Sequence, residues 1–271
     1  MTYRILCRSF SSHDAALLVS HFTGHPFSWC LLHRDEEFSF PDGLIARHEA
    51  GVPLQYLIGE AFFCGERFLV TPDCLIPQPD TEVLVEHAAH FLPEDGFFLD
   101  FCTGSGCIAL SLLLKRKKTS AAAVDISRKA LDVAEKNAEL HQLSDRVSFL
   151  ECDLLAGKFD TSLLAKCDLL VSNPPYIRRD VIPTLSEEVR HEPLLALDGG
   201  DDGLLFYRVF LQAYLPCLRE GVPALFEIGF DQAEAVSALC REYGYFYKIF
   251  RDFGGNDRVI AITRGKNTLG E

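Results

Sequence analysis

Residues 97–115 read Phe-Phe-Leu-Asp-Phe-Cys-Thr-Gly-Ser-Gly-Cys-Ile-Ala-Leu-Ser-Leu-Leu-Leu-Lys, and this stretch decides the fold. An apolar run of strand length enters a short loop with two glycines, and a leucine-rich segment of helical length follows. Glycine after a strand tolerates positive φ and lets backbone N–H groups approach a ligand. The stretch predicts one strand–loop–helix unit of an α/β sheet, although such a loop is also found as an ordinary tight connection.

Strand-length and helix-length segments continue to alternate along the chain. Strands are predicted at Phe97–Phe101, Ala121–Val124, Val147–Glu151, Asp168–Ser172, Pro223–Ile228, Tyr247–Arg251 and Val259–Thr263. Helices are predicted at Thr81–Phe91, Gly106–Lys115, Arg128–His141, Leu204–Leu218 and Gln232–Tyr243. The last two strands flank Gly254-Gly255-Asn256-Asp257 without a helix between them. The pattern therefore predicts a mainly parallel, seven-stranded sheet with helices on both faces and an antiparallel hairpin at its edge.

The amino-terminal part has a different texture. Short helical segments with polar breaks predict a small helical domain over residues 1–60, with Ser12 and Asp42 as helix caps. Aromatic residues around Cys64-Gly65 predict a β-hairpin linker over residues 61–80. Residues 81–271 then form the α/β domain.

Composition excludes several classes of protein. The 271 residues are 48% hydrophobic and 24% charged, as in ordinary globular domains. The formal charge is −13, with five basic against nine acidic residues up to position 75 and 21 against 30 beyond it. Neither part is suited to tracking a nucleic-acid backbone. Ten cysteines without a Cys-x-x-Cys pair indicate reduced thiols, and we expect a cytoplasmic protein that does not bind membranes.

Acidic residues at the ends of neighbouring strands point to a nucleoside. Asp125 lies 21 residues after Gly104, where a carboxylate can accept hydrogen bonds from ribose hydroxyls. Asp153 and Leu154 follow the next strand and would line an adenine pocket. Each aspartate is also consistent with a helix cap or turn. Asp100 before the loop Cys102-Thr103-Gly104-Ser105-Gly106 disfavours an anionic pyrophosphate and favours a cationic ligand, which indicates S-adenosylmethionine.

The fourth strand ends in Asn173-Pro174-Pro175-Tyr176. The prolines lack N–H groups and hold the backbone rigid, so this tetrad presents acceptors, among them the Pro174 carbonyl and the Asn173 side-chain oxygen. A planar amino group with two N–H donors is complementary, and Tyr176 would stack on it. Such acceptors favour the charge that develops as the nitrogen attacks a methyl group. A proline-rich loop leaving a strand is the alternative. The histidines lack a metal-ligand pattern, so no metal is expected.

These residues resemble the HemK/PrmC family of release-factor glutamine methyltransferases over about residues 51–264. The discriminating stretches are Pro53-Leu54-Gln55-Tyr56-Leu57-Ile58-Gly59, Ile76-Pro77-Gln78-Pro79-Asp80-Thr81-Glu82, Ala196-Leu197-Asp198-Gly199-Gly200-Asp201-Asp202-Gly203-Leu204 and Glu227-Ile228-Gly229. The resemblance implies a class I, Rossmann-like methyltransferase domain. It also implies that the helical domain helps to hold a class-1 peptide chain release factor, whose Gly-Gly-Gln glutamine would be methylated.

Carried over residue by residue, the resemblance assigns the 102–106 loop to the methionine part of the donor, Asp125 to its ribose, and Asp153 and Leu154 to its adenine. Asp100 and Asn173 would also contact the donor, while Asn173, Pro174, Pro175 and Tyr176 would bind the substrate amide. Cys102 stands where the family usually has glycine, and Gln78 where it usually has arginine.

Two other functions share parts of this pattern. An adenine amino-methyltransferase acting on DNA or RNA would use the same tetrad, but it needs a basic channel and a way to flip a base. A non-catalytic binding module would be indicated by loss of Asn173 or of the glycine loop, and both are present. We therefore expect a monomeric protein-glutamine methyltransferase without stable nucleic-acid binding.

Overall fold

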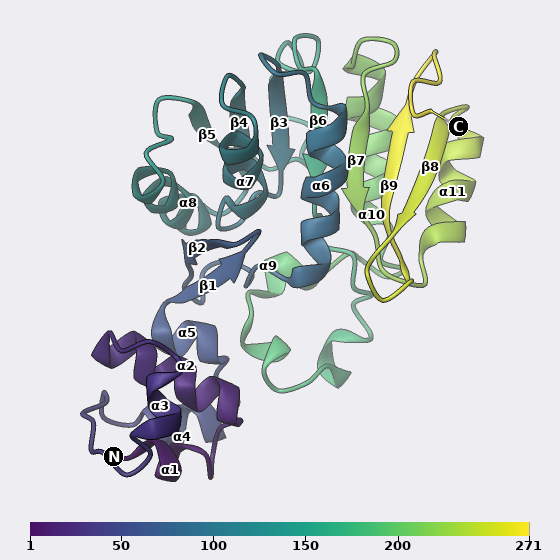
Figure 1. Cartoon of the computed structure of the whole chain (residues 1–271). Helices are drawn as coiled ribbons and strands as arrows, with labels where there is room; N and C mark the ends of the chain where they lie inside the picture. Colours follow the sequence, from purple (N-terminus) through teal and green to yellow (C-terminus); the bar gives the residue numbers. More distant parts are fainter. Residues whose placement is uncertain (271) are drawn as a thin grey trace. The chain divides into compact units, whose positions relative to one another are not determined.

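The computed structural model describes residues 1–270, and the chain divides into two compact units (Figure 1). The smaller unit comprises Met1–Glu60 together with Ser186–His191. The larger unit comprises Ala61–Leu185 and the chain from Glu192 onward. The roles expected of residues 1–60, 61–80 and 81–271 remain predictions.

Five short helices form the smaller unit. They are α1 (Tyr3–Leu6), α2 (Ser12–Thr23), α3 (Trp29–Leu32), α4 (Leu44–Glu49) and α5 (Leu54–Ile58). Their buried side chains form one apolar core that includes Leu6, Leu18 and Val19. Both predicted caps are wrong. Ser11 caps α2 by accepting a hydrogen bond from the backbone N–H of Asp14, one residue before the predicted Ser12. At α4 the chain enters through Gly43 at φ +74°, so Asp42 does not occupy the cap position.

A tight hairpin opens the larger unit. Strands β1 (Glu60–Phe63) and β2 (Glu66–Leu69) are joined at Cys64 and Gly65, as the sequence predicts. Both turn residues have positive φ, +52° and +80°, which is the conformation of the type I′ turn common in two-residue hairpins. Phe63 and Phe68 pack into the core of the larger unit, so this core anchors the hairpin.

Seven strands form one sheet in the order β5-β4-β3-β6-β7-β9-β8. Their bounds are β3 Phe97–Phe101, β4 Ser120–Asp125, β5 Val147–Glu151, β6 Leu169–Ser172, β7 Ala224–Glu227, β8 Phe246–Arg251 and β9 Asp257–Thr263. Neighbours from β5 to β7 are parallel, and β9 is antiparallel to both β7 and β8. The predicted fold class, a seven-stranded α/β sheet with an antiparallel hairpin at its edge, is confirmed.

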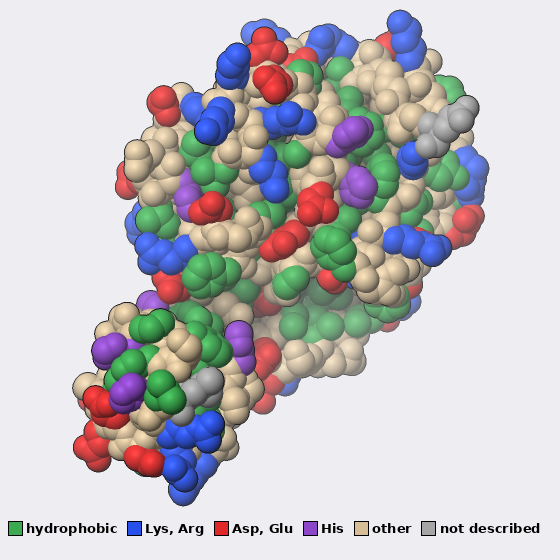
Figure 2. All heavy atoms as spheres, viewed as in Figure 1, with side chains coloured by type: hydrophobic (Ala, Val, Ile, Leu, Met, Phe, Trp, Pro, Cys, Tyr) green, Lys and Arg blue, Asp and Glu red, His purple; other side chains and the backbone are tan. Residues whose placement is uncertain are grey.

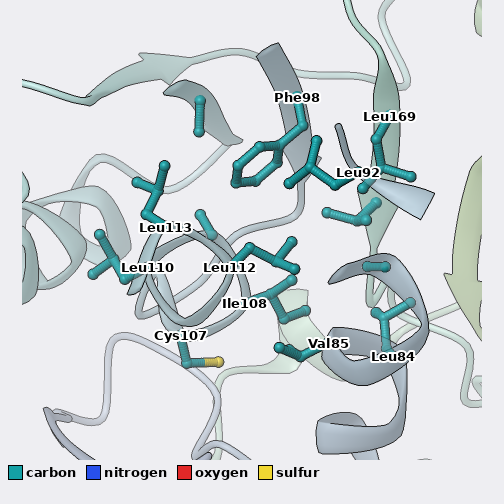
Figure 3. Close-up of a cluster of buried hydrophobic side chains, with 14 of the residues drawn as sticks. Leu84, Val85, Leu92, Phe98, Cys107, Ile108, Leu110, Leu112, Leu113 and Leu169 are labelled. Atoms are coloured by element: carbon teal, nitrogen blue, oxygen red, sulfur yellow. The ribbon is translucent and has the colours of Figure 1, made fainter. Parts of the chain in front are cut away.

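Alternate residues of each strand enter two different cores. Phe98 and Leu169 face one core, whereas their neighbours Leu99 and Leu170 face the other. Figure 3 shows the first core, in which Phe98 and Leu169 from the sheet meet side chains of two helices, such as Leu84 and Ile108. Successive strand side chains point to opposite faces, so a sheet covered on both sides requires nearly continuous apolar strands.

Helices cover both faces of the sheet. Their bounds are α6 Glu82–Phe91, α7 Cys107–Lys115, α8 Arg128–Leu140, α9 Leu194–Leu197, α10 Leu205–Val209 and α11 Ala233–Glu242. Short 3₁₀ segments occur at Pro79–Thr81, Ile182–Thr184 and Val189–His191. Within residues 1–270, no helix combines the length and apolar character needed to cross a bilayer.

The predicted helix over Leu204–Leu218 is wrong as a single element. After α10 the chain forms a π-helical turn at Phe210–Tyr214 and a 3₁₀ turn at Leu215–Cys217. Pro216 lacks an N–H group, and its ring clashes with the carbonyl four residues earlier, which prevents a regular α-helix here. The irregular segment still buries Phe210 and Tyr214 completely or nearly so.

Candidate functional site

The strand order brings the predicted site segments to one edge of the sheet. Central strand β3 pairs with β4 on one side and with β6 on the other, with Phe101 opposite both Val124 and Ser172. Three adjacent strand ends therefore carry Asp125, the last residue of β4, Cys102, which follows β3, and Asn173, which follows β6. The strand order reverses between β3 and β6, and α/β sheets bind ligands at such a switch point.

A pocket of about 290 Å³ lies at this edge. The predicted site residues that line it are Cys102, Gly104, Asp125, Asp153, Leu154, Asn173 and Pro175. Those that do not are Asp100, Thr103, Ser105, Gly106, Pro174 and Tyr176. Further lining residues, which sequence reasoning missed, include Asp73–Leu75, Pro193–Ala196 and Phe206.

The loop after β3 is shaped by three residues with positive φ. Cys102, Gly104 and Gly106 have φ values of +58°, +56° and +79°. A Cβ on Gly104 would meet nothing within 4 Å, so this glycine leaves space at the pocket wall. A Cβ on Gly106 would lie 3.1 Å from the Ala134 Cβ, so the second glycine permits close packing of α7 against α8. The two glycines thus serve different purposes.

Asp125 is held by local backbone hydrogen bonds at the end of β4. Its Oδ2 accepts from the Gly104 N–H at 2.8 Å, and its Oδ1 accepts from the Ser127 N–H at 2.9 Å. Burial raises the pKa of Asp125, and these backbone N–H groups oppose the rise. A carboxylate offers about four acceptor sites, so capacity remains on both oxygens for two ribose hydroxyls. The side chain that caps α8 is that of Ser127, which accepts from the Ala130 N–H.

Asp100 does not face the pocket. Its side chain is fully buried, and its Oδ2 accepts from the Thr103 hydroxyl at 2.6 Å and the Ala109 N–H at 3.2 Å. Burial raises its pKa to about 7. The sequence suggests that Asp100 attracts a cationic ligand. In the structure its carboxyl group instead holds the loop and the start of α7 on the side away from the pocket, so any effect on a ligand is indirect.

The residues after β5 form the opposite wall of the pocket. Asp153 accepts from the Leu155 and Ala156 N–H groups at 2.9 and 3.2 Å, so it stabilises the turn as well as lining the pocket. The Leu154 carbonyl accepts from the Tyr214 hydroxyl at 2.6 Å. This contact ties the wall to the irregular segment after α10.

The tetrad after β6 is fixed by partners that are distant in sequence. The Asn173 Nδ2 donates to the Thr81 Oγ1 at 3.2 Å. The Tyr176 hydroxyl donates to the Glu227 Oε1 at 3.2 Å, and the Gln232 Nε2 donates to the Tyr176 carbonyl at 3.0 Å. Glu227 is 2% exposed, and burial raises its pKa to about 7, while Thr81, Arg258 and Tyr176 oppose that rise.

Two glycines of the 196–204 stretch press against the tetrad backbone. A Cβ on Gly199 would lie 2.7 Å from the Tyr176 Cα, and a Cβ on Gly203 would lie 2.4 Å from the Tyr176 carbonyl oxygen. Both distances are shorter than a carbon side chain allows. The repeated glycines of this stretch therefore serve close backbone packing around the tetrad.

Sequence reasoning assigned no role to Thr81, Glu192 or Glu227. Thr81 and Glu227 contact the tetrad, and Glu192 accepts from the Ile76 N–H at 3.1 Å beside the pocket wall. All three are at most 8% exposed. Thr81 and Glu227 stand in stretches that carry the family resemblance, which was the available signal. Within the part of the chain that the structure describes, no cluster of three metal-ligating side chains occurs.

The surface carries mixed charges. Figure 2 shows basic and acidic side chains interspersed over the visible face of the larger unit rather than gathered in one basic stripe. Arg179, which lines the pocket, pairs with Asp198 at 3.0 Å and Asp201 at 2.9 Å. Its charge is therefore partly compensated.

Known proteins match the chain along most of its length. The family model for the Methyltransferase small domain matches residues 78–192, and that for the PrmC N-terminal domain matches residues 8–59. In fold, the hMettl16 catalytic domain, solved in complex with the MAT2A 3'UTR hairpin 6, is similar at a TM-score of 0.58 and 18% identity, covering 85% of each chain. That likeness shows the fold alone.

Curated relatives are more similar in sequence. The release factor glutamine methyltransferase of Bacillus subtilis (strain 168) is 42% identical over 237 residues, which cover 82% of this chain and 79% of the relative. That of Agrobacterium fabrum (strain C58) is 36% identical over 267 residues, covering 93% and 90%. At these identities and coverages, the chain belongs to the family of release factor glutamine methyltransferases.

Proposed function

We propose that the chain transfers a methyl group from S-adenosylmethionine to the side-chain amide nitrogen of a glutamine in class-1 peptide chain release factors, the glutamine of their Gly-Gly-Gln motif. The observation that carries this proposal is that the tetrad, whose prolines and Asn173 oxygen offer acceptors, follows β6 directly beside the pocket at the end of β3. Family membership names the substrate class.

The residues present fit the donor. Asp125 keeps acceptor capacity for two ribose hydroxyls because each oxygen accepts one backbone N–H. Leu154 is 4% exposed and supplies an apolar wall suited to an adenine ring. Gly104 leaves room for the methionine part at the loop. When bound, S-adenosylmethionine supplies an electrophilic methyl group on its sulfonium.

The tetrad's part in the reaction is to bind and orient the substrate amide. The Asn173 Oδ1 and the Pro174 carbonyl oxygen would each accept one hydrogen of the glutamine NH₂ group. The nitrogen of an amide is a poor nucleophile because its lone pair is delocalised. Both acceptors stabilise the positive charge that develops on that nitrogen, and rigid prolines hold the amide in line with the methyl group. As the bond from nitrogen to the methyl carbon forms, the bond from that carbon to sulfur would break and leave S-adenosylhomocysteine, and the extra proton on the nitrogen would pass to water.

The smaller unit is assigned to recognition of the release factor. Its helices α2 to α5 lie in the region matched by the PrmC N-terminal domain, and none of residues 1–60 lines the pocket. The chain would act as a monomer without stable nucleic-acid binding, consistent with its net charge of −13.

The test is methyl transfer from a labelled donor. The full chain is incubated separately with a release factor, with the same factor carrying Gln→Ala in its Gly-Gly-Gln motif, and with duplex DNA or single-stranded RNA. Label is expected on the unmodified factor alone. Equal labelling of the Gln→Ala factor, or labelling of nucleic acid, would contradict the proposal.

A further inference from the structure

Two buried side-chain amides hold backbone segments of the site, one on the methyl-donor side of the pocket and one on the side of the tetrad. Asn137 lies in α8 and is fully buried, and Gln232 comes just before α11 and is 9% exposed. A side-chain amide has an oxygen that accepts hydrogen bonds and an NH₂ group with two N–H donors. Each of these two amides accepts once and donates twice, in every case with a backbone group.

Gln232 ties three loops together beside the tetrad. Its Oε1 accepts from the Gly229 N–H at 2.9 Å, and its Nε2 donates to the carbonyls of Tyr176 at 3.0 Å and Gly203 at 3.2 Å. A backbone N–H only donates and a backbone carbonyl only accepts. These partners therefore admit one orientation of the amide, since a half-turn would set its NH₂ group against an N–H and its oxygen against two carbonyls.

Two of these loops have glycine where the amide enters. A Cβ on Gly203 would lie 2.7 Å from the Gln232 Nε2, and a Cβ on Gly229 would lie 3.0 Å from the Gln232 Oε1. A side chain at Gly203 would displace the amide, and one at Gly229 would crowd it. The carbonyl of Tyr176, the last residue of the tetrad, is thus held by an amide for which the neighbouring loops leave space.

Asn137 forms the corresponding contacts on the methyl-donor side. Its Oδ1 accepts from the Leu69 N–H at 2.7 Å, and its Nδ2 donates to the carbonyls of Leu69 at 3.0 Å and Ser105 at 2.9 Å. Leu69 is the last residue of β2, and Ser105 follows the pocket residue Gly104 in the loop after β3. Asn137 therefore ties the hairpin to the loop that is assigned to S-adenosylmethionine.

We infer that Gln232 and Asn137 are positioning residues, Gln232 for the tetrad that binds the substrate amide and Asn137 for the loop that receives the methyl donor. The inference rests on the proposed function and deepens it. Neither side chain lines the pocket, so each acts through the backbone that it holds. Loss of the Gln232 contacts should affect the rate of transfer, whereas loss of the Asn137 contacts should affect the affinity for the methyl donor.

A carboxylate in place of each amide tests the inference in the full chain. Gln232→Glu and Asn137→Asp keep the size of the side chain and replace the NH₂ group by an oxygen, so both N–H donors are lost while the group is ionised. Gln212→Glu is the matched control, because it makes the same chemical change at an exposed residue that does not line the pocket. The measurements are kcat and KM with a release factor, and the Kd of S-adenosylhomocysteine by calorimetry.

Gln232→Glu is expected to lower kcat by roughly 10- to 100-fold, because the tetrad is no longer held in line with the methyl group, and to change the Kd of S-adenosylhomocysteine by less than about 3-fold. Asn137→Asp should instead raise that Kd by roughly 10-fold or more and leave kcat at saturating methyl donor within about 3-fold. Gln212→Glu should match the unmodified chain. An unchanged kcat in Gln232→Glu, an unchanged Kd in Asn137→Asp, or the same pattern in both variants would overturn the inference.

The dependence of kcat on pH separates positioning from a general loss of structure. A protonated carboxyl group regains one O–H donor, which can again reach the Tyr176 or the Gly203 carbonyl. The rate of Gln232→Glu relative to the unmodified chain should therefore rise as the pH falls from about 9 to about 6. A rate that stays equally low over this range would contradict the role of Gln232. If a carboxylate variant does not fold, Gln232→Met or Asn137→Leu replaces it, and absence of the same split between kcat and Kd overturns the inference.

Backbone amide signals test the contacts without methyl transfer. The Ile177 N–H belongs to a peptide group whose carbonyl Gln232 holds, and the Gly106 N–H belongs to one whose carbonyl Asn137 holds. In ¹⁵N-labelled protein the Ile177 signal should shift in Gln232→Glu only, and the Gly106 signal in Asn137→Asp only. Unmoved signals would contradict the positioning roles, whereas a lack of methyl transfer by the unmodified chain would contradict the proposed function alone.

Discussion

The two halves of the pocket are built in different ways. On the β3–β4 side, Asp125 is held by the Ser127 N–H two residues away and by the Gly104 N–H at a neighbouring strand end. On the β6–β7 side, Asn173 depends on Thr81, 92 residues distant, and Tyr176 depends on Glu227 and Gln232, 51 and 56 residues distant. The first half uses mainly backbone groups, and the second uses the side chains of three residues that are distant in sequence.

This difference follows from the task of each half. A ribose diol can be bound by one carboxylate whose position is set by a strand end and a helix start. A weak nucleophile must instead be aligned to within a fraction of an ångström, so its acceptors need support from several directions. We therefore expect substitutions in the first half to affect donor affinity and those in the second half to affect kcat.

The largest effect is expected from Asn173→Ala. Removing one acceptor of the developing charge should lower kcat by roughly 10²- to 10³-fold, while the Kd for S-adenosylhomocysteine changes by less than about 3-fold. Single-turnover methyl transfer and calorimetry measure the two quantities. A collapse of donor affinity with a normal rate per bound donor would remove the distinction between the halves.

Asp125→Ala should show the reverse pattern. Loss of charge-assisted hydrogen bonds, at about 1.5–3 kcal/mol, should weaken donor binding by roughly 10- to 100-fold, and kcat at saturating donor should change by no more than a few-fold. The same calorimetry and kinetics provide the check. An Asp125→Ala protein with normal donor affinity would show that Asp125 is a turn residue here.

The supporting residues of the halves should differ in their contribution to stability. Gln232 accepts from the Gly229 N–H and donates to the Tyr176 and Gly203 carbonyls, so Gln232→Ala leaves three backbone groups without a partner. A cost of about 2–3 kcal/mol is expected. Ser127→Ala removes only the cap of α8, at about 1 kcal/mol. Urea unfolding followed by near-ultraviolet dichroism measures both, and equal costs would contradict the contrast.

A further prediction concerns the dependence of stability on pH. Burial raises the pKa of Glu192 from 4.5 to about 7. Because the folded pKa is the higher one, the stability from this group is complete below about pH 4.5 and is lost as the pH rises through about 7. Glu192→Gln should flatten this fall by up to about 1.4 kcal/mol per pH unit. Ser127→Ala should keep the slope, and an unchanged slope in Glu192→Gln would contradict the shift.

Much of the fold could be predicted because its signals are local. Alternation of strand-length and helix-length segments identified all seven strands of the sheet, with bounds that differ by a residue or two. The Gly104–Gly106 loop and the Cys64-Gly65 turn were also predicted, since positive φ is a property of single residues. The exceptions are also local: the helix caps predicted at Ser12 and Asp42 and the single helix predicted after Leu204. For that helix, Pro216 in the sequence already indicated an interruption.

By itself, the sequence determined the change from short helical segments to alternating strands and helices, the positions of the strand ends, and the hydrogen-bonding groups of the tetrad. The tertiary structure alone decided that Asp100 is buried, that Gly199 and Gly203 pack against Tyr176, that Thr81 contacts Asn173 and that Glu227 contacts Tyr176. The physical reason is that backbone conformation and amphipathic pattern are encoded over a few neighbouring residues. Distances between side chains from distant segments depend instead on strand order and packing, which no short stretch contains.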